Sequence, residues 1–185
     1  MQPEELALSP ARAFANTEWF EALFRYHYPG VVGFLTHLTG DPGQAEEIAA
    51  DTFSKLARRS GAVSGREEVA AWLYRVATNA GLDALRADAR RRRKEEAAGT
   101  ERLRVAAQPG ALEEMMRQER AARVRAVLAT LKPRDAQILL LRHEGMAYRE
   151  IARTLGVQSS SVGTLLARAE REFERRYRAR HGDNL

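Results

Sequence analysis

Hydrophobic residues recur along this chain with the 3.6-residue period of an α-helix. No segment alternates apolar and polar residues with β-branched enrichment, so no strand is predicted. Asn16 or Thr17 is expected to cap a first helix, which Pro29 should end or kink because proline lacks the backbone donor. A second stretch, 31–38, should stop at Gly40. The pattern therefore predicts an all-α protein.

The clearest single helix is expected after Asp41-Pro42, a capping side chain followed by proline at the first helical position. Its apolar positions form one continuous stripe, made of Ala45, Ile48, Ala49, Thr52, Phe53 and Leu56. The opposite face is polar and consists of Glu46, Glu47, Asp51, Ser54, Lys55 and Arg58. The following segment, 60–66, is predicted to be a loop because it is rich in Gly and Ser.

A long helix is predicted over 67–93. Its apolar arc is expected to comprise Val69, Leu73, Val76, Ala80 and Ala84. A polar stripe runs beside it, made of Asn79, Asp83, Arg86 and Arg90. Trp72 stands at the border, and we expect it in the core rather than as a stacking platform. Asp83 can alternatively be explained as a helical partner of Arg86.

Residues 95–110 lose this periodicity and end in Pro-Gly, which is typical of a flexible linker. A helix is expected to resume at about Ala111, another to start at Pro133, and two short helices to complete the fold. The chain is therefore predicted to consist of two small helical domains joined by the linker. The expected parts are an N-terminal arm 1–15, a first domain 16–94, the linker 95–110 and a second domain 111–185.

The window 148–165 has the spacing of a helix-turn-helix, and Tyr148 and Leu155 within it are expected in the core. Ala152 is small enough to let two helices cross closely, and Gly156 can adopt the left-handed turn between them. One of the serines 159–161 is expected to cap the second helix, whose N-terminal end would enter a DNA major groove. The alternative is a plain helical hairpin with an ordinary glycine turn. The basic helix that follows favours the DNA-binding interpretation.

Composition adds a modest basic excess, with 30 Lys and Arg against 25 Asp and Glu and a net charge of +5. The excess is concentrated in Arg90–Lys94 and in the last helix, which suggests contact with a polyanion, although such runs also occur on solvated faces. No cysteine is present, which excludes disulfides and thiol catalysis. The four histidines lie far apart, so no metal site is predicted.

The N-terminus does not resemble a signal peptide and no window approaches a membrane span, so we expect a soluble, cytoplasmic protein with no membrane contact. No combination of nucleophile, base or metal ligands can be assembled. We therefore predict no catalytic residues, no cofactor, no metal and no small-molecule substrate.

Together, these motifs resemble the extracytoplasmic-function (ECF) sigma factors, the compact branch of the sigma-70 family. The resemblance covers about Phe20 to Arg176 and is carried by three segments, which are 45–59, 72–93 and 128–173. Within them, Trp-Leu-Tyr-Arg is followed by Asn79, Asp83 and Arg86, and then by the helix-turn-helix. The resemblance implies a non-catalytic subunit that gives RNA polymerase its promoter specificity, with 16–94 as region 2 and 111–185 as region 4.

The resemblance also implies a role for each surface. The clamp helices of the polymerase's largest subunit would bind Glu46, Glu47 and Asp51. The minus-ten promoter element would be contacted by Asn79, Asp83, Arg86, Arg90 and Arg91, with a flipped base received by the loop carrying Ser64 and Arg66. The minus-thirty-five element would be contacted by Ser159, Ser160, Ser161, Gly163, Thr164, Ala167 and Arg168. An anti-sigma factor is expected as a further partner.

The sequence departs from the family pattern at a few positions. Ala50 replaces a usual Gln, and Ala147 stands where a Ser or Thr commonly caps the first helix of the helix-turn-helix. Gly163 and Leu165 stand where Lys or Arg often grips DNA.

The main alternative is a stand-alone helix-turn-helix regulator that binds an operator as a dimer. An enzyme with an appended DNA-binding domain is disfavoured because no catalytic residues can be assembled. A membrane-surface role for the basic C-terminal helix is weaker still, since Phe173 and Tyr177 give only a small apolar face.

Overall fold

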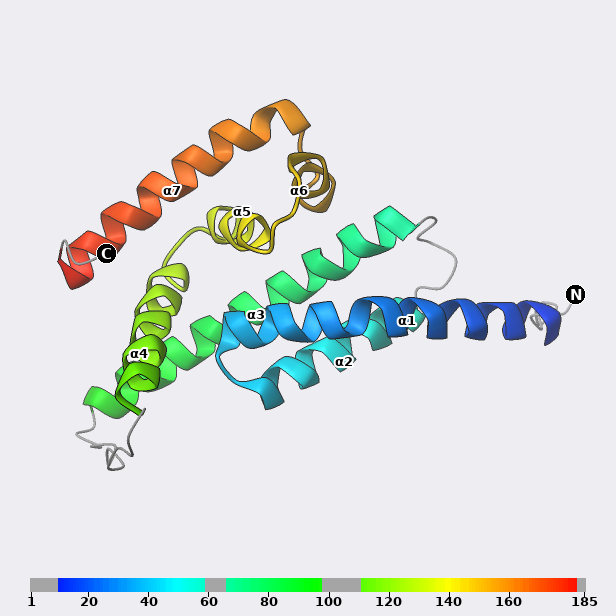
Figure 1. The fold of residues 1–185 in the computed structure, drawn as a ribbon, viewed down its shortest axis with the longest axis horizontal. Coiled ribbons are helices and arrows are strands. Elements are labelled where there is room, and N and C mark those ends of the chain that lie inside the picture. Colours follow the sequence, from blue (N-terminus) through cyan, green and yellow to red (C-terminus); the bar gives the residue numbers. More distant parts are fainter. Residues whose placement is uncertain (1–9, 59–65, 98–110, 183–185) are drawn as a thin grey trace, which may run out of the picture.

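The computed structural model describes residues 10–58, 66–97 and 111–182 (Figure 1). All regular structure in these ranges is helical, with no strand, as the hydrophobic pattern predicts. The N-terminal half holds α1 (Pro10–Thr39), α2 (Pro42–Arg58) and α3 (Arg66–Ala97). The C-terminal half holds α4 (Ala111–Leu128), α5 (Pro133–His143), α6 (Tyr148–Leu155) and α7 (Ser159–His181). No described helix is both long and apolar enough to cross a membrane.

The start of α2 is as predicted. The backbone N–H groups of Gly43 and Gln44 donate to Asp41 Oδ1 at 2.9 and 3.2 Å, which caps the helix. Its apolar stripe packs against α1 and α3, with every member buried except Ile48, which is partly buried. Thr52 fits this buried stripe because its hydroxyl donates to the Ile48 carbonyl at 2.8 Å.

The prediction for the first helix was wrong about its start, and the stretch 31–38 proved to belong to the same helix. α1 begins at Pro10, before the expected cap, and it continues through Pro29 to Thr39. Proline costs one backbone hydrogen bond, but here it sits on an exposed position. Buried residues on both sides, such as Leu23 and Val31, anchor the helix to the core and so offset that cost. The predicted stop is confirmed, because Gly40 follows the last turn with a φ of 75°.

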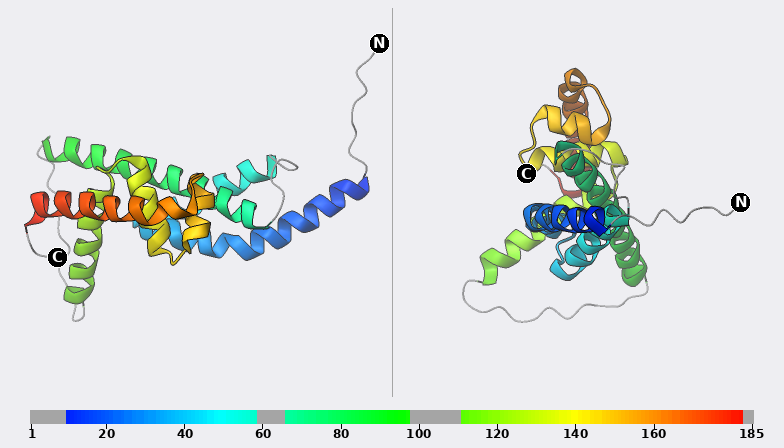
Figure 2. Two further views of the ribbon diagram at one scale, coloured as in Figure 1. Left: turned by 90° about the horizontal axis from the view of Figure 1, so that it is seen from above. Right: turned by 90° about the vertical axis from the view of Figure 1, so that its right-hand side faces the viewer.

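The predicted apolar arc of α3 was also partly wrong. Val69 and Leu73 are buried as expected, but the middle of the helix buries Ala77, Leu82 and Leu85 rather than the predicted residues there. The predicted residues Val76, Ala80 and Ala84 are only partly buried. Helix α3 is covered on one side by α1 and α2 and on another by α5 and α6, so its buried surface is wider than one arc (Figure 2).

The crossing of α1 and α3 depends on a glycine. A Cβ on Gly81 would lie 2.5 Å from Leu38 Cδ2 and 3.1 Å from Leu35 Cδ2, both in the core. A side chain at this position would therefore separate the two helices, as overpacking does in other cores. The close approach explains why Leu82, the next residue, is buried although the predicted arc omitted it.

The C-terminal half starts α5 at Pro133, as predicted, while α4 ends at Leu128 and leaves Leu131 outside any helix. The last helix is not short: α7 has 23 residues against 8 in α6. Helices α5, α6 and α7 enclose a buried cluster of their own, made of Ile138, Leu141, Ile151, Ala152, Val162, Leu166 and Ala169. The linker start at 95 was placed too early, since α3 runs to Ala97, and residues 98–110 lie outside the described ranges.

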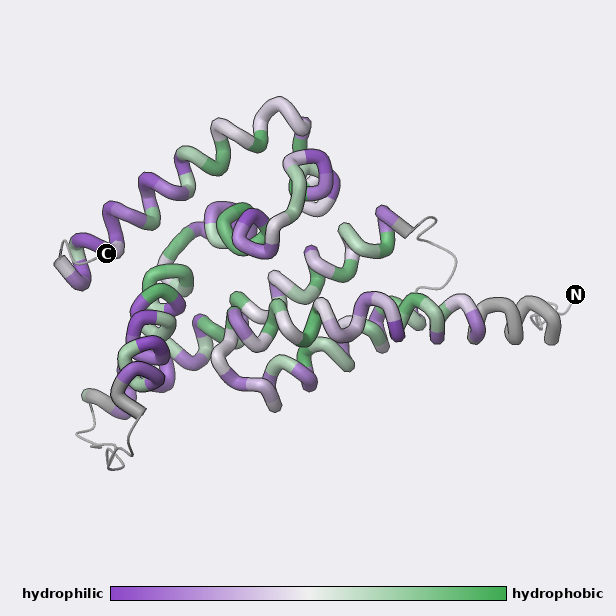
Figure 3. Tube along the Cα trace, viewed as in Figure 1, coloured by the Kyte–Doolittle hydropathy of each residue, from purple (hydrophilic) through white to green (hydrophobic). Residues whose placement is uncertain are grey.

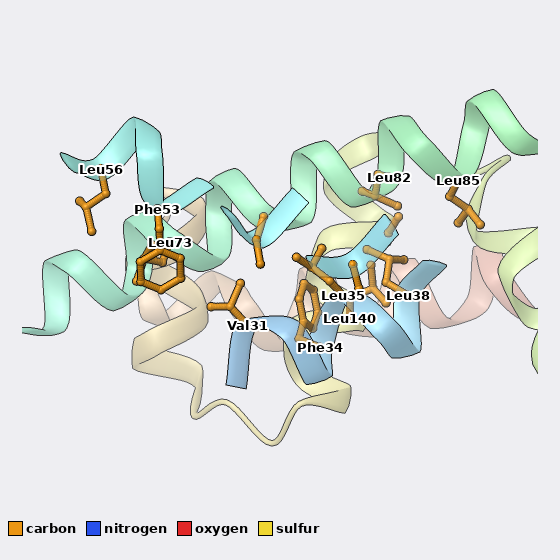
Figure 4. Close-up of a cluster of buried hydrophobic side chains, with 14 of the residues drawn as sticks. Val31, Phe34, Leu35, Leu38, Phe53, Leu56, Leu73, Leu82, Leu85 and Leu140 are labelled. Carbon is orange, nitrogen blue, oxygen red and sulfur yellow. The ribbon is translucent and has the colours of Figure 1, made fainter. Parts of the chain in front are cut away.

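The larger buried cluster joins the two halves of the chain. It contains the core of α1, α2 and α3 together with Leu128, Leu131, Ala136 and Leu140 of the C-terminal half. Figure 4 shows Leu140 beside Phe34 and Leu35 of α1. The two predicted helical domains therefore pack against each other and share one buried cluster in this structure.

Candidate nucleic-acid and polymerase interface

The acidic residues of α2 lie on its solvent face. Glu46, Glu47 and Asp51 are all exposed, and we call them the acidic face. Asp51 Oδ2 lies 3.3 Å from Lys55 Nζ, an exposed pair one turn apart that contributes little to stability. The opposite side of α2 is buried in the core, which fixes the position of the helix. The three carboxylates are therefore held in place on the surface of the protein.

The residues of the polar stripe of α3 differ in their exposure to solvent. Asn79 and Asp83 are exposed residues, while the Arg86 side chain is only 22% exposed. Arg86 Nη1 lies 3.4 Å from Asp83 Oδ1, and Arg86 Nη2 donates to the Leu131 carbonyl oxygen at 3.3 Å. The predicted pairing of Asp83 with Arg86 is thus present. The second contact, with the C-terminal half, was not foreseen.

The basic end of α3 lies beside α4. Arg90, Arg91, Arg92 and Arg93 are all exposed, and Arg91 Nη2 lies 2.7 Å from Asp88 Oδ1. Exposed guanidinium groups at one helix end are suited to following a phosphate backbone. Ser64 and the side chain of Arg66, predicted to belong to the base-receiving loop, lie outside the described residues.

Helices α6 and α7 form the predicted helix-turn-helix. Gly156 has φ 66° and ψ 42°, the left-handed turn, and the Val157 N–H donates to the Ala152 carbonyl at 2.9 Å. The predicted minus-thirty-five residues lie along the first three turns of α7. Ser159, Ser160, Ser161, Thr164 and Arg168 are exposed, and Gly163 and Ala167 are partly buried. This face of α7 is therefore open to a duplex.

Two details of this motif differ from the predictions, and a third concerns Ala147. None of the serines caps α7: the capping position is Gln158, and its side chain makes no capping hydrogen bond. Tyr148, expected in the core, is 43% exposed. Ala147 offers no side-chain acceptor at the start of α6, but its N–H donates to Glu150 Oε2 at 2.7 Å. Of the two hydrogen bonds of a capping box, the one between the Ala147 N–H and the Glu150 carboxylate is therefore retained.

Arg168 is tied to the body of the protein. Its Nη2 donates to Asp135 Oδ1 at 2.9 Å, and the Asp135 side chain is only 7% exposed. Asp135 lies in the first turn of α5, where the helix dipole also favours a negative charge. Helical periodicity cannot reveal a contact between residues far apart in sequence. Arg168 was therefore predicted to contact DNA, and its ion pair with Asp135 was not predicted.

We expect Arg168→Ala to lower the free energy of unfolding by about 1–2 kcal/mol, because it leaves a buried carboxylate without its charged partner. The estimate is modest because Arg168 itself is 57% exposed. Urea denaturation followed by circular dichroism measures it, with the exposed Arg171→Ala on the same helix as control. Equal midpoints for the two variants would show that the Asp135 contact is not stabilising.

The C-terminal part of α7 is strongly hydrophilic (Figure 3), and its basic run is partly compensated by glutamates of the same helix. Arg175 and Arg176 both donate to Glu172, at 2.7 and 2.6 Å for the closest atoms, and lower the pKa of that carboxyl to about 2. Arg178 lies 2.7 Å from Glu174. The positive charge of the C-terminal part of α7 is therefore smaller than its number of arginines suggests.

Two comparisons identify the parts of the chain. The family model for sigma-70 region 2 matches residues 23–91, which include the acidic face and the α3 stripe. The family model for sigma-70 region 4 matches residues 121–173, which include the helix-turn-helix.

Among curated proteins, the chain is 28% identical over 156 residues to the RNA polymerase sigma factor YlaC of Bacillus subtilis, covering 84% of this chain and 90% of that protein. It is 30% identical over 162 residues to the sigma factor CarQ of Myxococcus xanthus, covering 84% and 86%. It is 32% identical over 174 residues to the ECF sigma factor SigE of Mycolicibacterium smegmatis, covering 90% of this chain and 64% of the relative.

These matches favour the sigma-factor interpretation over a stand-alone helix-turn-helix regulator, because both sigma regions occur in one chain in the expected order. Sigma factors are regulatory subunits of RNA polymerase rather than enzymes. This chain belongs to the ECF group of the sigma-70 family, whose members direct core RNA polymerase to specific promoters and assist promoter opening at transcription initiation.

Proposed function

We propose that this sigma factor works through three separate surfaces. The acidic face of α2 docks on the clamp helices of the polymerase's largest subunit. The polar stripe and basic end of α3 contact the minus-ten element, and the first turns of α7 contact the minus-thirty-five element. The chain itself catalyses nothing, because phosphodiester formation belongs to the polymerase, and it acts in the cytoplasm, where the polymerase transcribes the chromosome.

The observation that carries this proposal is the α3 helix. One face of it belongs to the core through Val69, Leu73 and Leu82, which fixes its position. The stripe beside that face presents a carboxamide at Asn79 and ends in the exposed arginines 90–93. Amides and guanidinium groups are the side chains that contact base edges and phosphates, so the helix combines positioning with readout.

The proposed minus-thirty-five surface offers few side chains that can bind DNA strongly. The exposed hydroxyls of Ser159, Ser160, Ser161 and Thr164 can contact phosphates or base edges, but Gly163 contributes no side chain. Arg168 has its guanidinium engaged by Asp135. We therefore propose that minus-thirty-five binding is the weaker of the two DNA contacts. An anti-sigma partner is proposed on the resemblance alone.

Transcript mapping tests this function. The purified chain is mixed with core RNA polymerase and fragmented host DNA, and new start sites sharing two upstream motifs are expected. Asn79→Ala should reduce initiation at those sites about 10- to 100-fold, the usual cost of one lost base contact, while core binding is retained. Gln118→Ala is the matched control, since it removes another exposed carboxamide on α4, outside the three surfaces.

A chain that gives no new start sites with core polymerase would refute the proposal. Tight, symmetric binding of a duplex by the protein alone would point instead to a stand-alone regulator. Equal initiation by the Asn79→Ala variant and the Gln118→Ala control would leave the sigma role intact but remove Asn79 from the minus-ten surface.

A further inference from the structure

We propose that a basic cavity between α3, α4 and α7 binds a diphosphate group, either as the free anion or as part of a nucleotide. The cavity has a volume of about 160 Å³. Among the described residues, its walls carry one carboxylate, that of Asp88, and four arginines, which are Arg92, Arg93, Arg125 and Arg180. Arg125 and Arg180 belong to none of the three surfaces proposed above, so this convergence of positive charge has no role in promoter or polymerase binding.

Helical spacing directs the arginines of α3 and α4 toward the cavity. In α3 the wall positions recur every three to four residues along one face, as Leu85, then Asp88 and Ala89, then Arg92 and Arg93. In α4 they are Ala122, Arg125 and Ala126. Helix α4 contacts both α3 and α7 and lies between them (Figure 1). The alanines are short, so the arginines border a space that longer side chains would fill.

Arg125 gives the strongest indication of an anion site. Its side chain is partly buried and lies against the turn after α1, where a Cβ on Gly40 would be 2.6 Å from Arg125 Cζ. Burial lowers the pKa of Arg125, and the charge of Arg92 lowers it further, with no carboxylate of the described residues opposing them. A partly buried cation is costly unless an anion approaches it. An anion therefore gains more at Arg125 than at a fully solvated arginine.

The other three arginines are exposed, so their guanidinium groups can turn toward a ligand. No ion pair of Arg92, Arg93 or Arg180 occurs within the described ranges. The one negative group on the wall, Asp88, is already engaged, since its Oδ1 lies 2.7 Å from Arg91 Nη2. Guanidinium groups match phosphate geometry through paired hydrogen bonds, which makes arginine the preferred residue for phosphate recognition.

The size of the cavity indicates a small phosphate ligand. At about 30 Å³ for each water molecule, its volume corresponds to roughly five waters. A DNA duplex cannot enter such a space, whereas a diphosphate group can. A carboxylate could engage only part of a cluster drawn from three helices, but a diphosphate presents terminal oxygens on both of its phosphorus atoms. Several arginines can therefore donate to it at once.

A second cavity explains why the diphosphate can belong to a nucleotide. Arg125 also lines an apolar cavity of about 500 Å³, within the range of about 300–1,000 Å³ that is usual for small-molecule sites. Its walls include the rings of Phe34 and Phe173 and the side chain of Leu128. An organic group attached to the diphosphate would find apolar surface next to Arg125. The free anion would use the basic cavity alone.

Isothermal titration calorimetry of the full chain in magnesium-free buffer measures binding. The probes are inorganic diphosphate, ADP and adenosine, all at an ionic strength matched with sodium chloride. Arg125→Gln and Arg180→Gln each remove one guanidinium group from the cavity. The matched control is Arg120→Gln, which removes an exposed guanidinium group of α4 that does not line this cavity. Circular dichroism checks that each variant keeps its helix content.

The parent chain should bind inorganic diphosphate and ADP. Each cavity variant should lower both affinities at least about tenfold, the usual loss for a charge-assisted hydrogen bond. Arg120→Gln should keep them within about twofold. Binding of ADP at least about tenfold tighter than inorganic diphosphate would identify a nucleotide site that uses the apolar cavity. Equal or weaker binding of ADP would identify a site for the free anion.

Three results would overturn the site. The first is the absence of diphosphate binding, or equal affinities of Arg125→Gln and Arg120→Gln, which would mean that the arginines attract anions only through their overall charge. The second is binding of adenosine as tight as that of ADP, which would exclude phosphate recognition. The third is a loss of affinity for duplex DNA in Arg125→Gln as large as the loss for diphosphate, which would make Arg125 part of the DNA-binding surface. The titrations contain no polymerase, so their outcome is independent of the sigma role.

Discussion

Replacing Phe53 with alanine is expected to lower the free energy of unfolding by about 3–5 kcal/mol. The residue is 2% exposed, and its ring lies 5.0 Å from that of Phe24 and 5.5 Å from that of Tyr28, centroid to centroid. Truncation removes these contacts and leaves a cavity between α1 and α2. Because small proteins are stable by only about 5–15 kcal/mol, the loss is a large fraction of the total.

Urea denaturation followed by circular dichroism at 222 nm, a wavelength that reports helix, is the measurement. The control is Ser54→Ala at the neighbouring exposed position, where we expect a change within about 0.5 kcal/mol. Equal midpoints for the two variants would show that the aromatic cluster does not hold α2 in place. The acidic face would then lack the rigid support that the structure assigns to it.

Local signals predicted α2 well because everything that defines this helix lies within it. Asp41 caps the first turn, Pro42 occupies the first helical position, and one apolar stripe faces one core. The helix-turn-helix was predicted equally well. Its key residues, Ala152 in α6 and Gly156 in the turn that follows, lie close together in the sequence. Where a helix contacts a single neighbouring surface, periodicity and capping rules suffice.

The errors arose where tertiary contacts outweigh local preference. Pro29 should end a helix by its own chemistry, but the core on either side holds α1 together. Helix α3 packs on two sides, so its buried residues do not follow one arc. Tyr148 was assigned to the core from its place in the motif, yet it borders Gly163, whose Cβ would lie 3.6 Å from the Tyr148 ring, and the ring is partly solvated.

In the candidate DNA-binding site, too, the sequence predicted the helix positions of the residues but not their tertiary contacts. Sequence spacing placed Asn79 and Arg86 on one stripe, and the structure agrees. Their partners Gln137 and Leu131 come from the other half of the chain, as Asp135 does for Arg168. No period or motif links positions this distant, so the engagement of predicted DNA-binding residues could be learned only from the folded structure.

Reversing the acidic face with Glu46→Lys, Glu47→Lys and Asp51→Lys is expected to weaken binding to core polymerase by about 100-fold or more. Each change replaces attraction to a basic partner surface with repulsion, and charge pairs at protein interfaces contribute more than about 1 kcal/mol each. The three residues are exposed, so the fold should be unchanged. Fluorescence anisotropy of the labelled chain titrated with core polymerase measures the affinity.

The control must distinguish the loss of this surface from the change in net charge, because replacing any three acidic residues by lysine makes the chain more basic. Glu113→Lys, Glu114→Lys and Glu119→Lys change the charge by the same amount on exposed positions of α4. This variant should keep core binding within about twofold, and raising salt should weaken the parent complex as charges are screened. Equal losses in the two triple variants would mean that polymerase senses overall charge. Loss in the α2 variant alone would locate docking on α2, whose three carboxylates are exposed.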